Sequence, residues 1–214
     1  MLWTTLFATL LALQYTKSDP LTKTENSNLL STCGKFSQTK VFGGREAERS
    51  EAPWSVFLVT MGHDNTNTVC TGTVVSSRHI LTATHCFAAF DPSKGWNGLT
   101  YGPMDAASCK DGNYYITDPS VLSNVWIMLN KNDKITEYPE RITLVNACLK
   151  KSFEPGNAKI ANEDFAIIDL YDDLTFSAEI QPVCVSMSLD DHKTGTAMDY
   201  YGFGLKRQFF FYWH

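Results

Sequence analysis

His85 and Asp164 are the residues of this chain best suited to acid–base chemistry. His85 lies in an apolar run, Ile-Leu-Thr-Ala-Thr-His-Cys-Phe over residues 80–87, and Asp164 directly precedes another, Phe-Ala-Ile-Ile over residues 165–168. A histidine can activate a hydroxyl nucleophile as a general base, and a buried carboxylate can hold its ring in one tautomer. The alternatives are a structural histidine beside a structural cysteine, and a turn aspartate in a polar stretch.

A nucleophile to match this pair is missing from the sequence. After Asp164 the serines are Ser177, Ser186 and Ser188, and none is flanked by the glycines that let backbone amides converge on an oxyanion. The remaining histidines lack an apolar run and a neighbouring cysteine, so we expect them to be solvated: His63, His79, His192 and His214. The sequence thus predicts a base and an orienting acid without their nucleophile.

Composition excludes several other functions. The net charge is −5, and no run of Lys or Arg occurs, which argues against a nucleic-acid partner. The six cysteines include no Cys-X-X-Cys spacing, and no His-X-X-X-His spacing occurs either, so we expect no metal site. No cofactor is expected. Several pairings of six cysteines into disulfides are possible, and the spacing alone does not choose between them.

The elements that would position the pair are short strands. Residues 1–13 are apolar but too few for a membrane span, and they fit either a signal peptide over 1–18 or a buried helix. Residues 19–40 are polar and resemble a propeptide. From Val41 onward, short runs rich in Val, Ile, Phe and Thr alternate with turn residues, without sustained helical periodicity, which predicts an all-β sandwich or barrel. The expected strands are residues 56–59, 70–75, 80–82, 125–129, 142–145 and 165–170.

Four segments resemble the trypsin/chymotrypsin-like serine peptidases. Residues 80–87 are similar to the histidine box, residues 164–168 to the aspartate strand, residues 53–58 to the first core strand, and residues 40–44 to the activation site. The resemblance implies a closed β-barrel, the first of the two barrels of that fold, with the second barrel only begun over residues 197–204. It implies His85 and Asp164 as catalytic residues, and cleavage between Lys40 and Val41.

The resemblance also implies the disulfides. Cys70 and Cys86 match the pair that closes the histidine loop, and Cys33 and Cys184 match the pair that ties the propeptide to the connection between barrels. Cys109 and Cys148 then remain as a third pair. Cys109 belongs to an insertion between His85 and Asp164, a feature similar to trypsin-like proteins expanded in nematodes.

The family's Gly-Asp-Ser-Gly-Gly motif does not occur in the sequence. We therefore expect a signal peptide over 1–18, a propeptide-like segment over 19–40, a partial, C-terminally truncated peptidase domain over 41–204 and an unmatched aromatic tail over 205–214. The predicted function is a secreted, catalytically incomplete serine endopeptidase relative. The alternatives are a non-enzymatic binding or decoy pseudoprotease and a non-functional truncated isoform. The expected partners are protein or peptide substrates, without nucleic acid, and without a membrane once the signal peptide is removed.

Overall fold

A computed structural model describes residues 20–35, 51–61, 67–91, 95–99, 114–129, 142–149, 164–186 and 201–203. The predicted signal peptide, the activation site at Lys40 and Val41, Cys109, Ser188 and the aromatic tail lie outside these residues. Among the described residues, no helix is long and apolar enough to cross a membrane.

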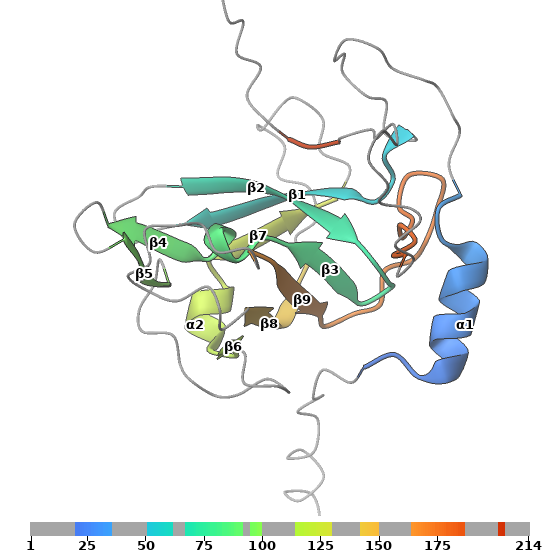
Figure 1. The fold of residues 1–214 in the computed structure, drawn as a ribbon, viewed down its shortest axis with the longest axis horizontal. Helices are drawn as coiled ribbons and strands as arrows, with labels where there is room; N and C mark the ends of the chain where they lie inside the picture. The colour runs from blue at the N-terminus through green and yellow to red at the C-terminus, as the bar shows by residue number, and fades with distance from the viewer. Residues whose placement is uncertain are drawn as a thin grey trace, which may run out of the picture.

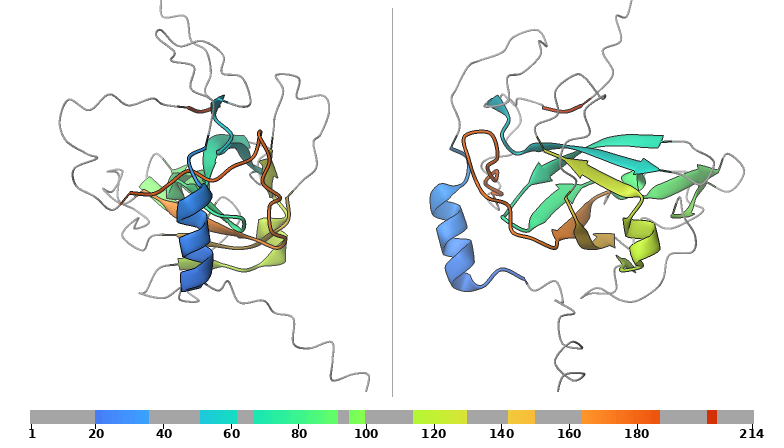
Figure 2. Two further views of the ribbon diagram at one scale, coloured as in Figure 1. Left: turned by 90° about the vertical axis from the view of Figure 1, so that its right-hand side faces the viewer. Right: turned by 180° about the vertical axis from the view of Figure 1, so that it is seen from behind.

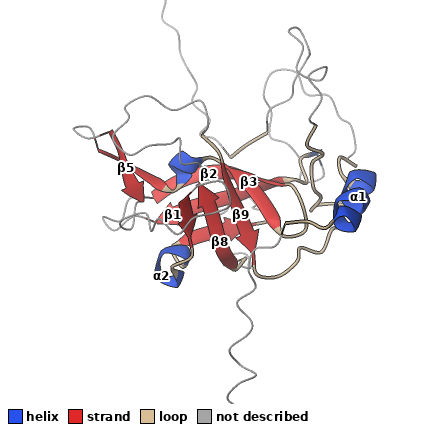
Figure 3. Cartoon of the chain, turned by 60° about the horizontal axis from the view of Figure 1, so that its bottom comes forward, coloured by secondary structure: helices blue, strands red, loops and turns tan. Residues whose placement is uncertain are grey.

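Seven antiparallel strands form one curled sheet (Figure 1, Figure 3). Their order is β6-β8-β9-β3-β2-β1-β7, and a separate hairpin pairs β4 with β5. The strands are β1 (Ser55–Met61), β2 (Asn67–Val74), β3 (His79–Thr82), β4 (Ala88–Asp91), β5 (Gly95–Leu99), β6 (Tyr114–Ile116), β7 (Val125–Met128), β8 (Leu144–Leu149) and β9 (Ala166–Leu170).

The sheet curls into a barrel around an apolar core. The backbone N–H of Ile142, just before β8, donates to the carbonyl of Ile127 in β7 at 3.4 Å, which links the two sides of the sheet. Inside the barrel, a side chain at Gly72 would come within 2.8 Å of both Ile80 and Val56, so glycine is required there. Fully buried aliphatic side chains fill the interior, among them Val56, Leu58, Val74, Ile80, Ile127, Leu149 and Ile168. The predicted all-β, trypsin-like barrel is confirmed.

The helix α1 (Lys23–Thr32) lies beside the barrel, at the end away from β4 and β5 (Figure 1, Figure 2). It begins with a capping box, in which the backbone of Glu25 donates to the Thr22 hydroxyl and the backbone of Thr22 donates to the Glu25 carboxylate. These bonds, together with Arg78, lower the pKa of Glu25 to about 2. No residue of α1 is buried, which is why hydrophobic periodicity did not reveal the helix.

Three contacts attach α1 to the barrel. Arg78, between β2 and β3, forms an ion pair with Glu25 at 3.1 Å. Cys33, which caps the helix, is disulfide-bonded to Cys184. The N–H of Gly34, whose φ is 69°, donates to the carbonyl of Pro182 at 2.9 Å. The segment over residues 20–35 is therefore held to the barrel by a disulfide, an ion pair and a backbone hydrogen bond.

Residues 201–203 pack against β1 and the segment before it. The rings of Tyr201 and Trp54 lie edge to face at 5.8 Å, and those of Phe203 and Phe57 at 5.3 Å. The N–H of Phe203 donates to the hydroxyl of Thr71 in β2 at 2.9 Å. This segment thus covers part of β1 and β2.

Candidate active site

The pairing of β3 with β9 brings the two predicted catalytic segments together. The last pair of that ladder joins Thr82 to Ala166. Beyond Thr82 the chain turns into a single turn of 3₁₀-helix, η2 (Thr84–Cys86), which holds His85, while Asp164 lies just before β9. The fold therefore places the two residues at the same end of one strand pair, although they are far apart in the sequence.

His85 and Asp164 form two hydrogen bonds. The ring atom Nδ1 of His85 lies 2.6 Å from Oδ2 of Asp164, and the backbone N–H of His85 donates to Oδ1 at 3.0 Å. An ionised carboxylate only accepts hydrogen bonds, so Nδ1 carries a proton and Nε2 is the basic nitrogen of the neutral ring. The His85 side chain is 40% exposed and that of Asp164 is 16% exposed. The arrangement can serve general-base chemistry, because the histidine is oriented by a largely buried acid and remains accessible.

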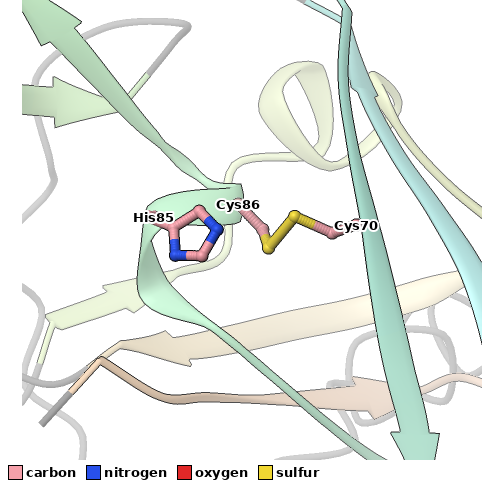
Figure 4. Close-up of side chains that lie close together, drawn as sticks. All are labelled: Cys70, His85 and Cys86. Atoms are coloured by element: carbon pink, nitrogen blue, oxygen red, sulfur yellow. A yellow bond between two sulfur atoms is a disulfide. The ribbon is translucent and has the colours of Figure 1, made fainter. Parts of the chain in front are cut away.

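The disulfide Cys70–Cys86 fixes the turn that carries His85 (Figure 4). Cys86 is buried in the core, and its sulfur lies 3.6 Å from the Thr82 hydroxyl. Cys70, His85 and Cys86 are the one group of potential metal ligands that the described residues bring together. Both sulfurs are consumed by the disulfide, so they are not available as thiolate ligands.

The remaining predicted site residues are distributed as follows. Cys33 and Cys184 are bonded to each other. Cys148 lies in β8, and its pairing with Cys109 stays a prediction because Cys109 is outside the described residues. Ser177 lies in an exposed turn, where its hydroxyl accepts a hydrogen bond from the N–H of Glu179. The roles predicted for Lys40 and Val41 also remain predictions.

The expectation that His79 is solvated is wrong. It begins β3 opposite Asp169 of β9, and its side chain is only 14% exposed. Its Nδ1 lies 2.6 Å from the Ser76 hydroxyl, and its Nε2 lies 3.4 Å from Oδ1 of Asp169. The backbone N–H of Arg78 donates to the same hydroxyl. Because Nε2 faces a carboxylate, it carries the proton of the neutral ring, and Nδ1 accepts from the Ser76 hydroxyl.

Burial is the main influence on His79. It lowers the pKa of His79 below 6.5, because removal from water disfavours the charged ring. Asp169 opposes this shift and Arg78 adds to it. Sequence reasoning missed this second pair because only the strand register shows that His79 faces an acid.

Comparison with known proteins identifies similar sequences. Residues 3–210 match the nematode trypsin-6-like family. The chain is 26% identical to melanization protease 1 of Drosophila melanogaster over 188 residues, which is 84% of this chain and 42% of that protein. It is 28% identical to the proclotting enzyme of Tachypleus tridentatus over 162 residues, which is 74% of this chain and 36% of that protein. The chain thus spans about two fifths of the length of these curated relatives.

Proposed function

Since the chain belongs to the nematode trypsin-6-like family, we propose that His85 and Asp164 are the general base and the orienting acid of a secreted serine peptidase centre, and that residues 1–214 by themselves do not turn over peptide substrates. The observation that carries this proposal is the double hydrogen bond between His85 and Asp164, two residues in segments that resemble the histidine box and the aspartate strand of serine peptidases.

In the proposed mechanism, Nε2 of His85 takes the proton from a serine hydroxyl as that oxygen attacks a peptide carbonyl. Asp164 keeps the proton of the ring on Nδ1 and stabilises the imidazolium that forms. Two features support these roles: the carboxylate engages both the ring and the backbone of His85, and the Cys70–Cys86 disulfide restrains the turn. Protein or peptide substrates are the corresponding class.

His85 and Asp164 still require a nucleophilic serine. The sequence contains no Gly-Asp-Ser-Gly-Gly motif, and the hydroxyl of Ser177 is engaged in a local turn. Removing the serine from such a triad lowers kcat by about 10⁶-fold, and the remaining rate depends on an intact oxyanion hole. We therefore infer that any peptidase activity requires a nucleophilic serine from a region outside the residues that the structure describes.

Secretion is part of the same proposal. The Cys70–Cys86 and Cys33–Cys184 disulfides are typical of an oxidising compartment, and residues 1–18 have the apolar character of a signal peptide. Cleavage between Lys40 and Val41, as in the activation of related peptidases, is proposed on the sequence match.

The test is an activity assay on the purified 214-residue chain secreted from eukaryotic cells. The chain is treated with a trypsin-type protease to cleave after Lys40, that protease is removed, and hydrolysis of peptide esters and labelling by a fluorophosphonate are measured. We expect neither to exceed the level of a matched His85→Ala variant. Stoichiometric labelling of Ser177 or Ser186 that is lost in His85→Ala would overturn the inactive part of the proposal and identify an unexpected nucleophile.

A further inference from the structure

The β3–β9 ladder ends before it reaches the candidate catalytic pair. Its last register pair is Thr82 with Ala166, whereas His85 and Asp164 both lie past this end, where β3 has already turned into η2. Strand hydrogen bonds therefore do not hold the two residues together. Other contacts must fix the distance between the turn and the segment before β9.

Thr84 makes one such contact. Its hydroxyl donates to the carbonyl of Phe165 at 2.8 Å, and the residue is only 1% exposed. Thr84 precedes His85, and Phe165 follows Asp164, so this bond joins the direct neighbours of the two candidate catalytic residues. With the two His85–Asp164 bonds, it makes a third link between the same two short segments.

Thr84 is buried and β-branched, so its hydroxyl points in one fixed direction. A threonine has restricted χ1 rotamers, so a buried one presents its oxygen in a fixed direction. Loss of the bond would leave the Phe165 carbonyl without this donor and would loosen the segment that carries Asp164. The Nδ1–Oδ2 contact, at 2.6 Å, is the part of the site most sensitive to such a shift.

We propose that Thr84 is a positioning residue, whose hydroxyl sets the place of Asp164 relative to His85 through the Phe165 carbonyl. This inference rests on the proposed function of the His85–Asp164 pair. Thr84 acts on Asp164 through the backbone of Phe165, and we propose no contact between Thr84 and the substrate.

The test follows the Nδ1 proton of His85 by NMR in the full-length secreted protein. A hydrogen bond this short to a carboxylate gives a strongly downfield imidazole proton that exchanges slowly with solvent. We expect Thr84→Val, which replaces the hydroxyl by a methyl group, to move this resonance upfield and to speed its exchange about tenfold, the effect of one hydrogen bond of ordinary strength. Thr84→Ser retains the hydroxyl and should keep the wild-type resonance.

Two controls separate positioning from general destabilisation. Thr60 is also buried, and its hydroxyl has no hydrogen-bond partner among the described residues, so Thr60→Val should leave the His85 resonance unchanged. Thr84→Ala and Thr84→Ser differ by a single oxygen atom, and this comparison replaces Thr84→Val if that variant does not fold.

A Thr84→Val or Thr84→Ala protein with the wild-type resonance and exchange rate would overturn the positioning role. The same result would leave the proposed function intact, because the His85–Asp164 bond would still be seen. A wild-type protein without any downfield His85 proton would instead show that the pair does not form in solution, which removes the premise of both proposals.

Discussion

Two histidine–aspartate pairs lie at opposite ends of the same two strands, β3 and β9. At one end, His79 and Asp169 face each other as a register pair inside the ladder, and their side chains are 14% and 8% exposed. At the other end, His85 and Asp164 lie past the last ladder pair, and the histidine is 40% exposed. The residue types are the same, but the surroundings differ.

The difference shows what makes such a pair suitable for chemistry. His79 contacts its acid through Nε2 and uses Nδ1 for Ser76, so both ring nitrogens are committed to buried protein groups. His85 contacts its acid through Nδ1 on a turn at the barrel rim. We conclude that position relative to the end of the ladder separates the structural pair from the candidate catalytic pair.

The largest expected effect follows from truncating the buried histidine. His79→Ala leaves the buried carboxylate of Asp169 without its histidine partner, and leaving a buried charged group without such a partner costs about 3 kcal/mol or more of unfolding free energy. His85→Ala, at the exposed pair, should cost less than about 1 kcal/mol. Urea unfolding of both variants makes the comparison, and equal losses would show that the two pairs do not differ in structural role.

The next effect concerns the disulfide beside His85. A Cys70→Ala/Cys86→Ala double variant opens a loop with a sequence separation of 16 residues. We expect a loss of roughly 3 kcal/mol from loop-closure entropy. The downfield His85 proton should disappear while the His79 ring resonances persist. A Cys33→Ala/Cys184→Ala variant serves as the control and should retain the His85 proton; loss of that proton in both variants would contradict a local role for Cys70–Cys86.

A smaller effect is expected from pH. The folded-state pKa of His79 lies below 6.5, so between that value and about 6.5 the unfolded chain binds more protons than the folded chain. Stability should therefore fall as the pH drops through this window. The charged groups that act on His79 are Asp169, Asp173 and Glu25, which raise its pKa, and Arg78, which lowers it.

Urea unfolding of the wild type and of His79→Gln between about pH 8 and pH 5 measures this contribution. Glutamine does not titrate, so its profile should be flatter over the window. Identical profiles would mean that His79 has the same proton affinity in the folded and unfolded chains.

The smallest effect should come from α1. Glu25→Gln removes a carboxylate that raises the pKa of His79, so that pKa should decrease slightly in an NMR titration. The His85 resonances should not move. Asp118→Asn removes another exposed helix-capping carboxylate, at α2 (Pro119–Leu122), and should leave His79 unchanged. An equal change of the His79 pKa in both variants would point to an effect of net charge rather than of the Arg78–Glu25 contact.

Much of the barrel could be predicted from the sequence because several of its strands, such as β1, β7 and β9, are mainly apolar runs. Residues 80–82 and 165–170 were predicted as strands and fall within or next to β3 and β9. The strand predicted at 142–145 continues instead to Leu149 as β8, since the chain stays in the sheet through the buried, polar Asn146 at a register shift.

Other features depend on information that apolar patterning lacks. The helix α1 has no buried face and was not predicted, and the Thr22–Glu25 capping-box spacing is the signal that could have found it. The burial of His79 depends on Asp169, which a distant part of the sequence brings opposite it. The proximity of His85 to Asp164 was implied by family resemblance, and the contribution of Thr84 depends on a hydroxyl direction that only coordinates define.

The Cys33–Cys184 bond makes the barrel a covalent ring, because the sequence separation across it is 151 residues and the nine strands of the described residues all lie between the two cysteines. A peptide bond cut anywhere from residue 34 to residue 183 therefore nicks the molecule without dividing it. Both fragments migrate as one species until a reductant is added, and His85 stays linked to Asp164 even when the cut falls between them. A single cut between residues 33 and 184 would thus leave the size of the molecule unchanged until its disulfides are reduced.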